Sequence, residues 1–178
     1  MDHIFIALNR DAFDKGINEI SGIRTNGKFG YLTKSAIKAA FTAKIDKNFD
    51  SVISDLKIKL DTINNPKFVV VAHNGDYLRT LVKGQTKENL FIERLWIDLS
   101  QLAWPLLCNG MISARTLDTL CSYFKVEINC VDSADDCSAL AQIYGQLMQR
   151  YKTALSGEET IREIGGDTLE GIRRMVGF

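Results

Sequence analysis

Phe68-Val-Val-Val-Ala-His-Asn-Gly-Asp-Tyr-Leu78 is the stretch of sequence that decides the fold. Its first five residues form an uninterrupted apolar run rich in β-branched side chains, which predicts a central strand buried on both faces of a parallel or mixed sheet. The polar residues His73 to Asp76 follow as an elbow, and Tyr77 to Val82 has a helical pattern. A buried strand that turns directly into a helix predicts an α/β domain.

Upstream of this stretch, the sequence predicts strands and one helix. Asn26-Gly27 is a dipeptide that type I′ hairpin turns favour, because both central residues of such a turn need a positive φ. Asn64-Asn65-Pro66 ends the helix that precedes the central strand. The predicted elements are strands at 3–8, 16–24 and 29–32 and an amphipathic helix at 46–60.

Downstream, the segment 95–107 begins like a strand and becomes helical before Pro105, and Ser113 can cap a helix that extends to Phe124. The clearest helix is predicted from Asp135 to Ala154. Its apolar residues form one stripe, for which core packing is the expected role: Cys137, Leu140, Ala141, Tyr144, Leu147, Met148 and Tyr151.

The last residues form a separate unit in this interpretation. Ser156-Gly157-Glu158-Glu159 has the spacing of a capping box, and Gly165-Gly166 separates two short amphipathic pieces. We therefore expect one domain at residues 1–155 and a short helical C-terminal extension at 156–178. A chain of 178 residues with 46% hydrophobic content is sufficient for one buried core.

Charge and cysteine usage restrict the classes of partner and site. Lys+Arg and Asp+Glu are equal at 22 each, so nucleic-acid binding would need a local basic patch. The four cysteines lack the spacing of a zinc site and are expected to be small buried residues in a reducing compartment. No signal peptide or membrane span is evident, so we expect a soluble, cytoplasmic protein that has no membrane partner.

Five segments, in order, resemble the DEDDh-type 3′→5′ exonuclease family, which includes the ε-subunit of bacterial DNA polymerase and ribonuclease T. The likeness is best over residues 67–151 and implies a ribonuclease-H-like fold, with a mixed sheet flanked by helices. The segments are INEISGIRTNGK (17–28), FVVVAHNGDYL (68–78), LWIDLSQLAWPLL (95–107), ARTLDTLCSYFKVEI (114–128) and DSADDCSALAQIYGQLMQRY (132–151).

Members of this family use two divalent cations, held by carboxylates, to hydrolyse a terminal phosphodiester. At the positions where the resemblance puts those carboxylates, this chain has Ala7, Asn9 and Leu78, and only Asp136 matches. Val131 stands where the family has its general-base histidine, and valine cannot accept a proton. The resemblance therefore implies a degenerate site without an expected cofactor, with Mg²⁺ or Mn²⁺ relevant only to residual activity.

Other polar residues offer partial replacements. Glu19, Asp76 and Asp136 are the carboxylates from which a rearranged metal site could be built, although Glu19 on a strand is more often solvated or hydrogen-bonded. Asp136 also suits the first turn of its helix, where a negative charge interacts favourably with the helix dipole. His73 and Asn74 match the family, with a structural role at the elbow as the favoured interpretation.

A nucleic acid could meet a few further residues at the mouth of the cleft. Arg10 and Arg79, with His73 and Asn74, are the candidate contacts, and ordinary solvated charge is the alternative. The two tryptophans, Trp96 and Trp104, could stack on bases, but their apolar neighbours in the sequence favour core packing.

The sequence thus predicts an exonuclease-like domain whose function has shifted from cleavage to binding, in the manner of a viral or replication accessory factor. The expected partner is a protein of replication, repair or RNA processing, and single-stranded nucleic acid is the second candidate. An active metal-dependent exonuclease with a rearranged carboxylate site is the alternative.

Overall fold

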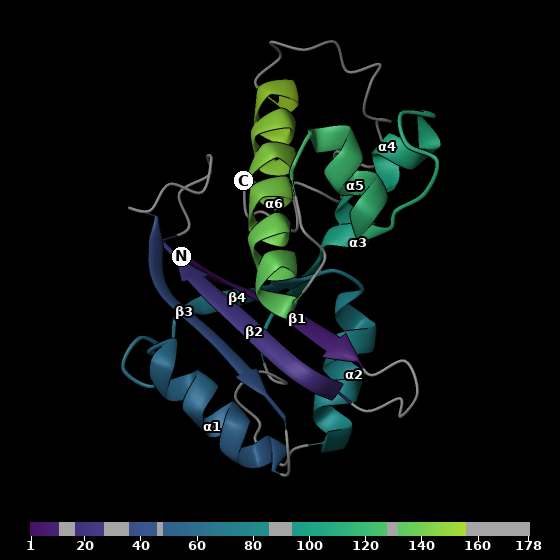
Figure 1. Ribbon diagram of the computed structural model, residues 1–178. Coiled ribbons are helices and arrows are strands. Elements are labelled where there is room, and N and C mark those ends of the chain that lie inside the picture. Colours follow the sequence, from purple (N-terminus) through teal and green to yellow (C-terminus); the bar gives the residue numbers. More distant parts are fainter. Residues whose placement is uncertain (11–16, 27–35, 46–47, 86–93, 128–131, 156–178) are drawn as a thin grey trace.

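The computed structural model describes residues 1–10, 17–26, 36–45, 48–85, 94–127 and 132–155. A mixed five-stranded sheet has the strand order β3-β2-β1-β4-β5 (Figure 1). β1, β2 and β3 pair antiparallel, whereas β4 runs parallel to both β1 and β5. The strands are β1 (Asp2–Arg10), β2 (Ile17–Thr25), β3 (Ile37–Lys44), β4 (Phe68–Ala72) and β5 (Trp96–Asp98).

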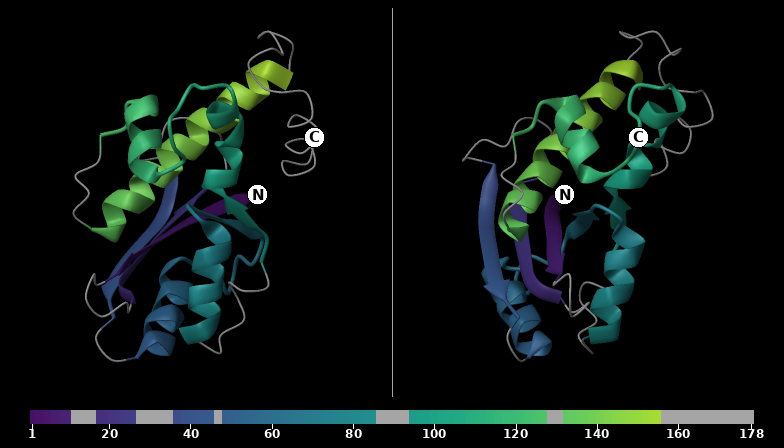
Figure 2. Two further views of the ribbon diagram at one scale, coloured as in Figure 1. Left: turned by 90° about the vertical axis from the view of Figure 1, so that its right-hand side faces the viewer. Right: turned by 45° about the vertical axis from the view of Figure 1, so that its right-hand side comes forward.

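Helices cover both faces of this sheet (Figures 1 and 2). The first two pack on one face, and the remaining four gather on the other, where α6 crosses the strands. The layering confirms the predicted α/β class, with a mixed sheet flanked by helices. The helices are α1 (Phe49–Lys59), α2 (Gly75–Gln85), α3 (Leu99–Leu102), α4 (Trp104–Cys108), α5 (Leu117–Phe124) and α6 (Ser133–Leu155).

Alternation along the strands divides the apolar side chains between two cores. In β1, Ile4 and Ile6 belong to the α1-side core, whereas Phe5 and Ala7 belong to the α6-side core. All five residues of β4 are buried, because this strand is covered on both faces. That double burial explains the uninterrupted apolar run that predicted the strand, and the predicted bounds are confirmed.

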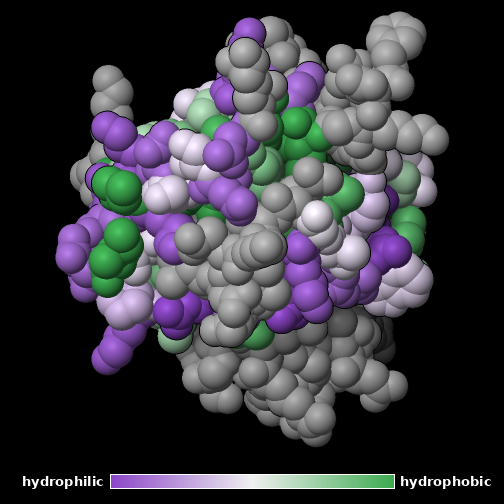
Figure 3. All heavy atoms as spheres, turned by 90° about the horizontal axis from the view of Figure 1, so that it is seen from below, coloured by the Kyte–Doolittle hydropathy of each residue, from purple (hydrophilic) through white to green (hydrophobic). Residues whose placement is uncertain are grey.

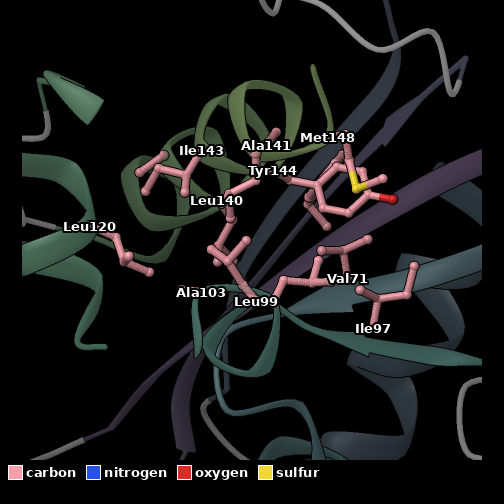
Figure 4. Close-up of a cluster of buried hydrophobic side chains, with 14 of the residues drawn as sticks. Val71, Ile97, Leu99, Ala103, Leu120, Leu140, Ala141, Ile143, Tyr144 and Met148 are labelled. Atoms are coloured by element: carbon pink, nitrogen blue, oxygen red, sulfur yellow. The ribbon is translucent and has the colours of Figure 1, made fainter. Parts of the chain in front are cut away.

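The long helix α6 supplies much of the α6-side core. Every residue of its predicted stripe is buried, which confirms core packing as the role of that stripe. Figure 4 shows Leu140, Tyr144 and Met148 of α6 facing side chains that come from the sheet and from α3. Full burial of such a side chain contributes about 1.5–3 kcal/mol relative to exposure, so the stripe fixes α6 on the sheet.

The edge strand beside β2 was not predicted from the sequence. Ile37–Lys44 forms β3 and pairs with β2 from Glu19↔Lys44 to Thr25↔Ile37. The return strand at 29–32 and the turn residue Gly27 lie outside the described residues. The sequence IKAAFTAK has three alanines, which have low strand propensity, so this edge strand gave a weak signal.

Two local predictions on the α6 side are wrong. The N-cap of α5 is Thr116, whose Oγ1 accepts a hydrogen bond from the Thr119 amide at 3.3 Å, and not Ser113. Cys108, expected to be buried, is exposed at the end of α4, whereas Cys121 and Cys137 are buried as expected. The cap was misplaced because both residues are good N-caps and only the backbone path selects between them.

A buried arginine donates hydrogen bonds to the segment that joins α1 to β4. Arg24 donates to Asp2 at 2.8 Å and to the carbonyl oxygens of Leu60, Asp61 and Asn65 at 2.7–2.9 Å. Burial acts to raise the pKa of Asp2, but hydrogen bonds from Lys38 and Arg24 outweigh it and lower this pKa. The guanidinium thus satisfies the carbonyl groups where α1 ends and the chain turns toward β4.

The surface on the α1 side is mainly hydrophilic. Ile58 and Ile63 are exposed large hydrophobic residues in and after α1, and Figure 3 shows hydrophobic groups set among hydrophilic ones on the lower face. Single exposed apolar side chains are normal on soluble surfaces. No helix in the described ranges is long and apolar enough to cross a bilayer.

Candidate functional site

The first two motif positions lie in β1. Ala7 is 6% exposed and belongs to the α6-side core, with Ser21 as its register partner in β2. The backbone of Asn9 pairs with Glu19 in the same ladder. Glu19 is 9% exposed, which excludes the solvated one of its two expected states, solvated or hydrogen-bonded, and it lies on a strand as predicted.

The second motif forms the elbow between β4 and α2. Asn74 adopts a left-handed backbone conformation, with φ of 55°, which asparagine tolerates better than most residues. His73 donates from Nε2 to the carbonyl oxygen of Arg115 at 2.6 Å, because a carbonyl can only accept. Leu78 follows in the first turn of α2 and is half-buried, and its apolar side chain offers no ligand to a cation.

The first turns of α6 are held against the sheet by hydroxyl and thiol groups. Ser21 Oγ lies 2.6 Å from Ser133 Oγ and 2.8 Å from Thr42 Oγ1, which connects α6 to β2 and β3. Cys137 Sγ donates to the carbonyl oxygens of Ser21 at 3.1 Å and Phe5 at 3.5 Å. Burial raises the pKa of the Cys137 thiol above its ordinary value, so the thiol stays protonated and keeps donating.

Asp136, which the family resemblance matches to a metal ligand, lies in the first turn of α6, as the sequence predicted. Burial raises its pKa, and the negative charges of Asp118, Asp135 and Asp132 raise it further, while His73 opposes them. The capping hydrogen bond comes from a neighbour, because Asp132 Oδ1 accepts from the Asp135 amide at 2.9 Å. Asp136 therefore stands in an acidic environment close to the elbow.

The candidate carboxylates do not assemble into a metal centre. Asp76 is exposed at the start of α2, Glu19 is buried in β2, and Asp136 is half-buried in α6. Among the residues that the structure describes, no group of three His, Cys, Asp or Glu side chains could hold a metal ion. The donor set around Ala7 and Leu78 therefore does not fit a pair of hard cations, which need several carboxylate oxygens.

The remaining predicted contacts are dispersed. Arg79 is half-buried on α2, whereas Val131 and the side chain of Arg10 lie outside the described parts of the chain. Trp96 is partly buried against the α1-side core, which confirms packing for this tryptophan.

Trp104 departs from its prediction. It is 45% exposed, and the Arg115 guanidinium lies over its ring, 4.5 Å from the centroid. Arg115 also donates from Nη1 to the Ser100 carbonyl at 3.2 Å. Sequence reasoning did not single out Arg115, because the two residues meet only through the path of the segment between α4 and α5.

Comparisons with known proteins bear on the fold. No protein family model matches the sequence, and no curated protein matches it. Among solved structures, one similar to this chain is exonuclease X in complex with 5′ overhanging duplex DNA. It matches with a TM-score of 0.51 and 16% identity, over 83% of this chain and 92% of that one. At this identity the likeness concerns architecture alone, and the chain has a ribonuclease-H-like fold, a mixed sheet flanked by helices.

Proposed function

We propose that this protein is a catalytically degenerate 3′→5′ exonuclease-like domain that acts as a binding accessory factor. The observation that carries the proposal is Ala7, a buried methyl side chain where the family resemblance puts a carboxylate. A methyl group cannot bind a hard cation, and Leu78 leaves a second ligand position without an oxygen donor. Without the cation pair, the attacking water and the leaving oxygen have no Lewis acid to stabilise them.

The packing of α6 supports the same proposal. The junction of α6 with the sheet is made by neutral side chains, those of Ser21, Ser133, Thr42 and Cys137. These neutral groups satisfy one another without a metal, so they suit a domain in which the fold no longer depends on cations. The role left for the retained surfaces is binding.

Two classes of partner fit a binding domain of this kind. A protein of replication, repair or RNA processing fits an accessory role, which includes one in a viral replication system. Single-stranded nucleic acid is the second class, and the solved structure of exonuclease X holds duplex DNA. Since the net charge of this chain is zero, nucleic acid would bind at a local patch of the surface. That binding would weaken as the salt concentration rises, because contacts with phosphates release counterions.

The test is a digestion assay on 3′ ends. Purified protein is incubated with end-labelled single-stranded and duplex DNA and RNA in Mg²⁺ or Mn²⁺, and we expect no metal-dependent shortening. Digestion that is abolished by Asp136→Asn and unaffected by Asp55→Asn, an exposed carboxylate of α1, would overturn the proposal. That outcome would instead establish the alternative, an active exonuclease with a rearranged site.

A further inference from the structure

We propose that Trp104 and Arg115, the Trp104–Arg115 pair, form a stacking site for an unpaired base of single-stranded nucleic acid. The inference rests on the proposed binding function and names one ligand class and its contact site. It reverses the sequence prediction for Trp104, because the structure leaves this side chain 45% exposed.

The exposure of Trp104 follows from the way α4 packs. Leu102 and Leu106 are 3% and 2% exposed in the α6-side core, so this short segment turns its leucines inward. Trp104 begins α4 on the outer side. It is the one exposed large hydrophobic residue in the described β5, α3, α4 and α5. Leu95, which is also exposed, precedes β5. A single exposed aromatic ring suits one flat ligand group better than an extended peptide.

The ring is held in place before any ligand arrives. Arg115 lies over one face of Trp104 at 4.5 Å and is fixed by its hydrogen bond to the Ser100 carbonyl. The backbone of Arg115 is fixed in turn by His73, which donates to its carbonyl oxygen at 2.6 Å. Because both side chains are already ordered, a ligand that stacks on the indole meets a smaller entropic cost.

The chemistry of the pair matches a nucleotide. An indole ring stacks on any base through its π face, and this stacking tolerates every base. The guanidinium strengthens the platform through its cation–π contact and supplies a positive charge for the neighbouring phosphate. These are the two components of single-strand recognition, an aromatic platform and a local positive charge.

The position of the pair suits a strand that passes the β4–α2 elbow. Through His73, Arg115 is joined to the β4–α2 elbow, and His73 is close enough to Asp136 to oppose the rise in its pKa. A second combination of arginine and aromatic ring stands at the last turn of α5, where the Arg150 guanidinium lies 5.8 Å from the ring centroid of Tyr123.

The presence of only two tryptophans allows a direct test. Because the chain has two tryptophans, Trp96→Phe leaves Trp104 as the only indole fluorophore. Trp96 is partly buried on the other face of the sheet. The Trp96→Phe protein is titrated with oligothymidylate at low salt while the indole emission is recorded. We expect saturable quenching by the oligonucleotide and none by an abasic oligonucleotide of the same length, because stacking needs a base.

Variants separate stacking from other effects. Trp104→Ala is expected to weaken oligothymidylate binding, measured by fluorescence anisotropy, about tenfold. Trp104→Phe should retain most of the affinity, because it keeps an aromatic ring. Ile58→Ala, an exposed apolar residue of α1, is the matched control and should leave affinity unchanged. A thermal melt confirms that each variant is folded.

Three results would overturn the inference. They are equal quenching by the abasic oligonucleotide, unchanged affinity of Trp104→Ala, and no oligonucleotide binding at low salt. None of them affects the proposed loss of cleavage, which fails only through metal-dependent digestion in the assay above. Conversely, digestion by a protein whose affinity still depends on Trp104 would remove the proposed function and leave the stacking site.

Discussion

At the scale of single residues, the proposed loss of the metal site rests on Ala7. We predict that Ala7→Asp does not restore a metal site but destabilises the protein by about 3 kcal/mol, because it buries a carboxylate without a compensating charge. The measurement is the free energy of unfolding from urea denaturation, with and without Mn²⁺.

Ala7→Ser is the control for this substitution, because it adds a small polar group without a charge and should cost much less. An unfolding free energy for Ala7→Asp that rises when Mn²⁺ is added would contradict the prediction. It would mean that the new carboxylate finds a cation that Asp136 and its neighbours help to bind.

His3 should make the protein sensitive to acid. Burial beside Tyr144 lowers the pKa of His3 from 6.5 to about 4, so the unfolded chain takes up a proton at a higher pH than the folded protein does. Stability that is fully present above pH 6.5 is therefore lost as the pH falls toward 4, by about 3 kcal/mol in total. The measurement is the unfolding free energy at a series of pH values.

Comparison with His3→Gln isolates this contribution, because Asp2, Asp136 and the other titrating groups are common to both proteins. The difference in unfolding free energy between the two should change across the interval from pH 6.5 to 4. A constant difference across this interval would show that His3 is not buried in its neutral form.

Residue chemistry is the part of the site that sequence could predict. The residue types of Ala7, Leu78 and Asp136 are known without coordinates, so the sequence alone shows that only the last of the three side chains carries oxygen atoms. Exposure was not, because it depends on what covers each side chain: Glu19 is buried and Trp104 is exposed, both against expectation.

At the scale of elements, the junction of α6 with the sheet can be tested through one hydrogen bond. Ser21 Oγ and Ser133 Oγ lie 2.6 Å apart in a buried location. We predict that a double-mutant cycle of Ser21→Ala and Ser133→Ala gives a coupling energy of about 1 kcal/mol in unfolding free energy. Additive effects of the two substitutions would show that this hydrogen bond does not help to hold α6 on the sheet.

The same elements show why some structure was predictable. β4 and α6 have strong patterns, a continuous apolar run and a periodic stripe, because each is buried in a simple way. β3 was not predicted, because this edge strand of small side chains buries little apolar surface and its sequence therefore has a weak strand pattern. The pairing of strands across the sheet depends on long-range contacts, which periodicity does not encode.

At the scale of the whole molecule, the fold agrees with that of an exonuclease, whereas the described side chains do not form a metal site. The sheet order and the helices on both faces agree with the family resemblance, and a solved exonuclease structure matches most of the chain. The described carboxylates nevertheless do not gather into a group that could hold a metal ion. Two hydrophobic cores and the hydrogen bonds between α6 and the sheet hold the described architecture together.

The most direct test of this account is a crystal of the protein soaked in MnCl₂, with anomalous scattering used to locate manganese. We expect no pair of manganese peaks beside the Asp136 carboxylate. Two peaks there, with the Asp136 carboxylate bound to at least one of them, would contradict it.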